Sequence, residues 1–131
     1  MMFKITPVTD SAERENIASE LGFELREGSF IYSMRDADTL KLMGASQFEI
    51  LAGYGIIYDL KCPLGEDDFE AMFILGRQTM NFIDMCGISD QRAEIGSAKE
   101  ELLRAIGFKK EEKYYRASSE GMFDGSHCGG H

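Results

Sequence analysis

Apolar and polar positions along this chain predict strands and helices in turn, arranged around one central apolar run. That run, GIIYDLK at residues 55–61, has the near-continuous apolar content of a strand buried on both faces of a sheet. Pro63 ends it, and a long helix is predicted from Asp67 or Asp68 to Gly87. Apolar residues recur in this helix at the three- and four-residue steps of a core-facing stripe: Phe69, Met72, Phe73, Gly76, Met80 and Ile83.

Four further runs predict strands. Residues 2–8 alternate in polarity, and Pro7 puts this strand at the edge or end of a sheet, because proline cannot donate to a ladder. Residues 30–36 and 39–50 flank a polar turn and predict an antiparallel hairpin. Residues 88–95 are the weakest candidate, since their centre is polar and the prediction rests on their position between two helices.

A helix is predicted between the first strand and the hairpin. Asp10 or Ser11 can cap its start, and Gly22 supplies a left-handed stop. The apolar stripe of this helix consists of Ala12, Ile17, Ala18 and Leu21.

The last helix and strand complete the fold prediction. Ser97 can cap a helix in which Glu100 completes a capping box and Gly107 ends the helix. Residues 109–117 then predict a final strand. The order of elements indicates an α/β (α+β) domain with a mixed, mostly antiparallel central sheet flanked by helices.

Length suits one compact domain over residues 1–117, followed by a flexible Gly/Ser-rich tail at 118–131. The tail brings together His127, Cys128 and His131, whose side chains are typical zinc ligands. A structural zinc site usually needs four ligands, so Cys62 or Cys86 would have to supply the fourth, and adventitious metal capture is the alternative.

Charge and hydropathy exclude some partners and locations. The formal net charge of −9 disfavours nucleic acid or an anionic membrane surface as a partner, because the long-range field repels both. No apolar run approaches the roughly 20 residues of a membrane-spanning helix, and the first ten residues lack the apolar core of a signal peptide. We therefore expect a cytoplasmic protein. Three cysteines without a disulfide-type spacing predict reduced thiols.

The order of elements over residues 2–117 resembles the GNAT acyltransferase superfamily. The most specific segment is GSAKEELLRAIGFKKEEKYY at residues 96–115, which is similar to the family's fourth helix, its terminal Gly-Phe pair and the strand that follows. Gly44 also falls where a hairpin-strand glycine is common in the family. The resemblance implies that acetyl-CoA enters a gap beside the central strand, and that the backbone of Leu60, Lys61 and Cys62 binds its pantetheine.

The turn before the long helix departs from the family pattern. Family members place a basic or glutamine residue and alternating glycines here, so that free N–H groups hold the CoA diphosphate. This chain has a single glycine, Gly65, followed by Glu66, Asp67 and Asp68. One carboxylate about 5 Å from a phosphate charge costs on the order of 3 kcal/mol at an effective dielectric constant of 20. The same carboxylates can instead cap the helix and interact favourably with its dipole.

Candidate chemistry lies near the central strand. Asp59 and Glu94 are carboxylates that could accept a proton from an amine if burial raised their pKa, although solvated or ion-paired carboxylates are commoner on strands. Cys62 could act as a nucleophile, but both histidines lie in the tail, so a packing role suits it better, as it does Cys86. The family's tyrosine proton donor falls on Leu103 here, and its hydroxyl is therefore missing.

Two functions follow from these observations. The first is an acetyl-CoA-dependent N-acyltransferase that acts on a small-molecule or peptide amine, or an inactive form of such an enzyme. The second is a non-catalytic GNAT-like module that has lost CoA binding and binds a small ligand or a protein, including a second copy of itself as a homodimer.

Overall fold

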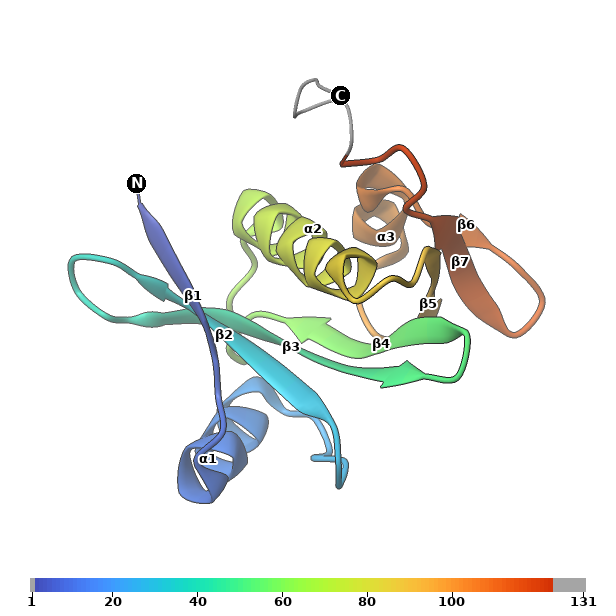
Figure 1. The fold of residues 1–131 in the computed structure, drawn as a ribbon. Helices are drawn as coiled ribbons and strands as arrows, with labels where there is room; N and C mark the ends of the chain where they lie inside the picture. Colours follow the sequence, from blue (N-terminus) through green and yellow to red (C-terminus); the bar gives the residue numbers. More distant parts are fainter. Residues whose placement is uncertain (1, 124–131) are drawn as a thin grey trace.

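The computed structural model describes residues 2–123, and within them one seven-stranded sheet carries three helices (Figure 1). Helices α2 and α3 lie on one face of the sheet and α1 on the other (Figure 1). The elements are β1 (Phe3–Pro7), α1 (Ser11–Leu21), β2 (Phe30–Asp36), β3 (Leu42–Leu51), β4 (Tyr54–Lys61), α2 (Phe69–Met85), β5 (Asp90–Glu94), α3 (Glu100–Ile106), β6 (Lys109–Lys110) and β7 (Tyr114–Ser118).

The strand order is β1-β2-β3-β4-β5-β7-β6, and every neighbouring pair except one is antiparallel. The exception is β4 with β5, which run parallel and pair over three positions, from Gly55 with Gln91 to Ile57 with Ala93. The mixed, mostly antiparallel sheet flanked by helices is therefore confirmed, with β1 at one edge.

Short-range signals at two helix starts are confirmed. The Asp10 carboxylate accepts a hydrogen bond from the Glu13 N–H and caps α1, which Gly22 ends at a φ of 77°. The Asp68 carboxylate accepts from the Ala71 N–H at 3.1 Å and caps α2. The prediction for α3 is wrong, because Lys99 occupies the cap position without a side-chain bond, and Ser97 lies before the helix.

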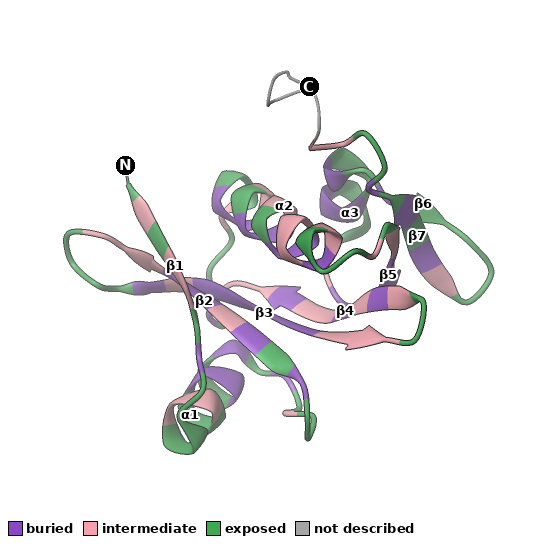
Figure 2. Cartoon of the chain, viewed as in Figure 1, coloured by how far each residue is buried: buried purple, intermediate pink, exposed green. Residues whose placement is uncertain are grey.

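The main core lies between the sheet and the helices α2 and α3 (Figure 2). α2 contributes one continuous buried face, made of Ala71, Met72, Leu75, Gly76, Thr79, Met80 and Ile83. Phe69, predicted in this stripe, lies in the first turn and is exposed. A smaller core under α1 joins Ile17, Ala18 and Leu21 to β2, β3 and Val8, which follows β1. Ala12 is exposed.

The central strand β4 is buried on one face only. Gly55, Ile57 and Leu60 face the core, whereas Ile56 and Tyr58 are half-buried on the other face. The prediction of burial on both faces was wrong because the helix on that side, α1, packs beside β3 (Figure 1). The prediction of a single final strand at residues 109–117 was also wrong, because residues 109–118 form a hairpin of two strands, β6 and β7.

We expect Gly76→Ala to destabilise the fold because α2 and α3 meet at this glycine. A Cβ at Gly76 would lie 2.5 Å from Cδ1 of Ile106 and 3.1 Å from Cδ2 of Leu60. The overpacking should cost about 1–3 kcal/mol, which exceeds the gain of about 1 kcal/mol in helix propensity. Urea unfolding measures the change in the free energy of unfolding.

Ile106→Val is the matched control, because it removes the Cδ1 atom that the new methyl would meet. Alone it should cost about 0.5–1.5 kcal/mol, but in the Gly76→Ala background it should cost less or stabilise. Strict additivity of the two changes would contradict the packing that we describe.

Candidate functional site

A cleft opens where β4 and β5 stop pairing. Beyond Ile57 and Ala93 the two strands separate, and the Ser97 carbonyl accepts a hydrogen bond from the Leu60 N–H at 2.8 Å. A cavity of about 430 Å³ lies at this end of β4, between the loop that leads into α2 and the loop that leads into α3. Its lining includes Leu60, Lys61, Cys62, Gly65, Gly96, Ala98, Lys99 and Leu102.

Leu60, Lys61 and Cys62, to which the resemblance assigns pantetheine binding, line this cavity together with Gly65, the fourth candidate for cofactor binding. The backbone donor of Leu60 is engaged by the chain itself, which removes one of the groups expected to bind pantetheine. Leu103, at the place of the family's tyrosine, is fully buried in the core. The cleft has the size of a small-ligand site but fewer free hydrogen-bonding groups than the resemblance implies.

The acidic loop before α2 is occupied by its own contacts. Asp68 caps the helix, and Asp67 forms a 2.6 Å ion pair with Lys99 that joins the loops on the two sides of the cavity. The Asp67 carboxylate raises the pKa of Lys99 by hydrogen bonding to its ammonium group. Glu66 lies 3.5 Å from Lys41. With Lys99 paired and the helix start capped, these residues do not fit a diphosphate group.

Cys62 lines the cleft as a protonated thiol. Burial raises its pKa, and the carboxylates of Asp67, Asp68 and Glu66 raise it further, against a 3.4 Å hydrogen bond from the Asp68 N–H. A thiol of this kind is a poor nucleophile at neutral pH. The packing role holds for the half-buried Cys62 but not for Cys86, which is exposed at the end of α2.

Asp59 lies on the face of the sheet opposite α2. Its side chain is 13% exposed, lies 3.4 Å from the Lys61 ammonium group and accepts a 2.9 Å hydrogen bond from Gln47 Nε2. Burial raises the pKa of Asp59, while Gln47 and Lys61 act in the opposite direction. A carboxylate with a raised pKa is a better proton acceptor than one in free solution.

Glu94 is on the neighbouring strand β5 in a more open setting. It pairs with Arg26 at 3.0 Å, and both side chains are nearly half exposed. The Arg26 guanidinium group also stacks 3.9 Å from the centre of the Tyr58 ring. Tyr58 donates a hydrogen bond to Glu49, and burial raises the pKa of Tyr58 to about 12.

Gln47 is the residue of the candidate site that sequence reasoning missed. Its fully buried amide accepts from the Arg26 N–H and the Ser29 hydroxyl, and donates to the Glu24 carbonyl and to Asp59. All four of its hydrogen-bonding positions are therefore used. The available signal was a polar residue at a buried position of a strand, since such a group must be satisfied.

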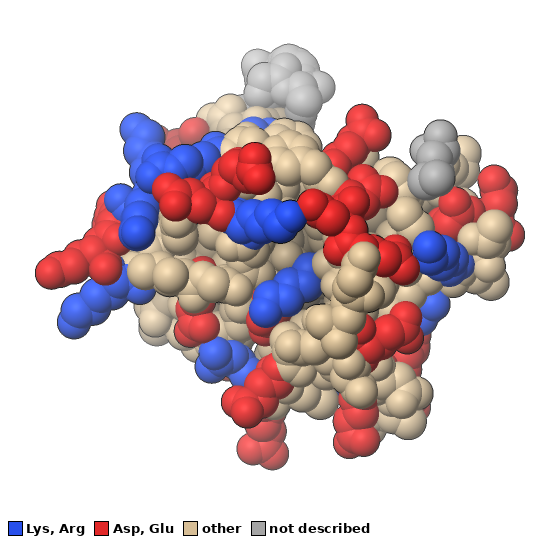
Figure 3. Space-filling model, turned by 180° about the vertical axis from the view of Figure 1, so that it is seen from behind, with Lys and Arg blue, Asp and Glu red and all other residues tan. Residues whose placement is uncertain are grey.

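The predicted zinc ligands His127, Cys128 and His131 lie outside the described residues. Within residues 2–123, no group of three His, Cys, Asp or Glu side chains could hold a metal ion. No helix in the same range is both long and apolar enough to cross a membrane. The face shown in Figure 3 carries acidic and basic side chains interspersed, so it offers no continuous basic surface.

Comparison with known proteins identifies the fold. No protein-family model and no curated protein matches the sequence. Solved structures do match. The N-acetylglutamate synthase of Neisseria gonorrhoeae, complexed with coenzyme A and N-acetyl-glutamate, aligns at a TM-score of 0.69 and 16% identity, over 86% of this chain and 29% of that one.

Two shorter N-acetyltransferases match over most of their length. The PaiA N-acetyltransferase of Thermoplasma acidophilum, in complex with coenzyme A, aligns at a TM-score of 0.63 and 13% identity, over 88% of this chain and 97% of that one. The ribosomal-protein-S18-alanine N-acetyltransferase of Escherichia coli aligns at 0.66 and 8%, over 88% and 89%. The chain therefore has the fold of the GNAT N-acetyltransferases, as its sequence predicted.

We expect the Cys62 thiol to react several-fold more slowly with iodoacetamide at pH 8 than the Cys86 thiol. Burial and the nearby carboxylates keep Cys62 protonated, whereas Cys86 is exposed. Trypsin separates the two thiols into peptides 62–77 and 78–92, so mass spectrometry can follow each one. Faster alkylation of Cys62 than of Cys86 would mean that the thiol is activated and would restore it as a candidate nucleophile.

Proposed function

We propose that this protein is an N-acyltransferase that passes an acyl group from a thioester, such as that of acetyl-CoA, to an amine of a small molecule or peptide. The observation that carries the proposal is the cavity of about 430 Å³ at the point where β4 and β5 separate. It lies in a GNAT fold, and structures with this fold include complexes with coenzyme A.

The donor site favours the thioester arm of the donor over its phosphates. The cavity is large enough for a pantetheine-sized group, and a bound thioester would supply the acyl group to be transferred. The loop around Asp67 repels phosphate instead of holding it. We therefore expect the arm to account for most of the binding, with the diphosphate left in solvent.

Asp59 is the proposed proton acceptor. β4 carries it one position before Leu60, so it faces the side of the sheet opposite α2 while Leu60 faces the core. An amine that approaches from that side would lose its proton to a carboxylate whose pKa burial has raised. The net charge of −9 attracts a protonated amine to the protein as a whole, whereas Glu94 is neutralised by its ion pair with Arg26.

A second function rests on a different observation. The Leu60 N–H, the helix cap and the Asp67–Lys99 pair all satisfy groups that a donor would otherwise use. This self-satisfaction favours a non-catalytic module that binds a small ligand or a protein, or pairs as a homodimer. Binding measurements separate the two functions.

We expect weak, saturable binding of acetyl-CoA, strengthened about fivefold by Asp67→Asn. The substitution removes a carboxylate from the donor site and releases Lys99 from its ion pair. Because Asp67 is largely exposed, solvent screening reduces the effect to about 1 kcal/mol. Isothermal titration calorimetry measures the affinity, and Asp38→Asn, an exposed carboxylate in the β2–β3 turn, is the control that should change nothing.

The same titration with S-acetylpantetheine tests the donor site directly. S-acetylpantetheine should bind at least as tightly as acetyl-CoA, because the diphosphate gains nothing from the protein. Absence of heat with either compound at millimolar concentration would reject the acyltransferase and leave the binding module.

We expect Asp59→Asn to lower the acyl-transfer rate by about 10²-fold or more, with little loss of stability, since asparagine can still accept from Gln47. In the wild type the rate should rise with pH through the pKa of Asp59, because only the carboxylate form accepts a proton. That rise should be absent in Asp59→Asn, and release of the free thiol measures both rates. Glu94→Gln should keep the rise with pH, whereas an Asp59→Asn variant with the wild-type rate would rule out the role of Asp59.

A further inference from the structure

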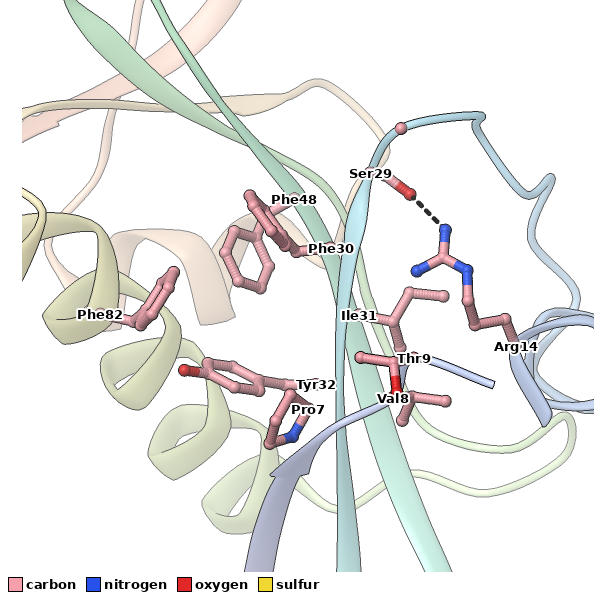
Figure 4. Close-up of a pocket in the computed structure, with 11 residues that line it drawn as sticks. Pro7, Val8, Thr9, Arg14, Ser29, Phe30, Ile31, Tyr32, Phe48 and Phe82 are labelled. Carbon is pink, nitrogen blue, oxygen red and sulfur yellow. Dashed lines mark hydrogen bonds between the residues drawn. The ribbon is translucent and has the colours of Figure 1, made fainter. Parts of the chain in front are cut away.

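A second cavity, of about 520 Å³, lies where β1 ends beside the start of β2 (Figure 4). Most of its wall is aromatic. Neighbouring rings in this group have centroids 5.4 to 6.2 Å apart, and several meet edge to face: Phe30, Tyr32, Phe48 and Phe82. These rings come from two strands and from α2, so the cavity is formed by the tertiary fold.

Phe30 is left exposed at the cavity. Its side chain is 47% exposed, although it contacts the buried ring of Phe48 at a centroid distance of 5.6 Å. A half-exposed phenylalanine at the rim of an aromatic cavity is a feature of ligand sites, since a bound apolar group would remove the ring from water.

Past the start of β2, on the α1 face of the sheet, the same cavity carries a cation (Figure 4). Arg14 lines it from α1, and its Nη2 donates a 3.1 Å hydrogen bond to the Ser29 hydroxyl (Figure 4). Ser29 is itself 6% exposed, with its hydroxyl within hydrogen-bond distance of Gln47 and of the Arg26 carbonyl, so it holds the guanidinium group in place. Within the described part of the chain, Arg14 forms no ion pair with a carboxylate.

We propose that this cavity binds an aromatic carboxylate. The ring system would lie against the exposed ring of Phe30 at the start of β2, where ring contacts add to the burial of apolar surface, and the carboxylate would extend past the edge of the strand. The carboxylate would pair with the free N–H groups of Arg14, whose planar fork matches two carboxylate oxygens. The net charge of −9 repels anions from most of the surface, so an anion needs a nearby cation that no carboxylate neutralises. Arg14 is such a cation.

This inference does not depend on the proposed acyl transfer. The aromatic cavity and the cleft at the end of β4 share no lining residue. Binding here can succeed or fail whatever acetyl-CoA does, and the two sets of measurements are separate.

The test is a titration with 2-naphthoate, followed by its fluorescence, which no tryptophan disturbs because the chain has none. We expect saturable binding with a Kd of about 100 μM or tighter. Arg14→Gln should weaken it by about tenfold or more, because a charge-assisted pair is lost, and Phe30→Ala should weaken it several-fold. Arg104→Gln, which removes an equal charge from an exposed pair on α3, should leave the affinity unchanged.

Two further ligands define the chemistry. The neutral 2-naphthylmethanol should bind at least about tenfold more weakly than the acid, and equally to wild type and Arg14→Gln. Tighter binding of octanoate than of 2-naphthoate would reject an aromatic ligand. No saturation at millimolar 2-naphthoate, or wild-type affinity in an Arg14→Gln variant with an unchanged Tm, would reject the site. If Arg14→Gln does not fold, Phe30→Ala and the acid–alcohol comparison decide the question.

Discussion

The close packing of α2 onto β4 is the constraint on which the rest of the molecule depends. Two glycines allow it. A Cβ at Gly55 would lie 2.5 Å from Cγ2 of Ile83, and one at Gly76 would meet α3. Because neither glycine has a Cβ, the buried face of α2 lies directly on the strand. Each fully buried large apolar side chain there contributes about 1.5–3 kcal/mol. The helix thereby covers one end of β4 and begins beside the other.

That placement explains the cleft and its unusual electrostatics together. α2 must begin next to the end of β4, where β5 has already separated from it. A helix start presents unpaired N–H groups, and either a ligand phosphate or the chain's own carboxylates can satisfy them. Here the Asp68 carboxylate caps the helix, and Asp67 forms an ion pair with Lys99 from the loop before α3. The proposed preference of the cleft for a thioester arm over phosphates rests on these local contacts.

The sequence predicted the fold well because the signals for its elements are short-range. Caps such as Asp10 and Asp68, and stops such as Gly22, act within one turn of a helix, and a window of a few residues contains them. The errors arose where neighbours distant in sequence decide the outcome. Whether the second face of β4 is covered depends on where α1 packs, and the capping role assigned to Ser97 failed because its carbonyl bonds β4.

The candidate site shows the same difference between short-range and long-range signals. The family resemblance could point to Leu60 and Cys62 because both lie at the end of one strand, so no contact distant in sequence had to be predicted. Gln47 could not be assigned in this way, since its partners lie 12 to 23 residues away. The aromatic cavity has the same origin: Phe30 and Phe82 are far apart in the chain, and each alone is typical of core packing.

Gln47 also connects the two sites physically. Its amide bonds Asp59 through one atom and Ser29 through the other, and Ser29 accepts the hydrogen bond from Arg14. Every hydrogen-bonding position of the amide is used, and the group is fully buried, so removing the amide would leave partners such as the Arg26 N–H unsatisfied at a cost of about 1–3 kcal/mol. The position of the proposed base and the position of the cation in the aromatic cavity are therefore fixed by the same side chain. The bonds from Gln47 to Glu24, Arg26 and Ser29 thus hold the loop between α1 and β2 against β3, beside both sites.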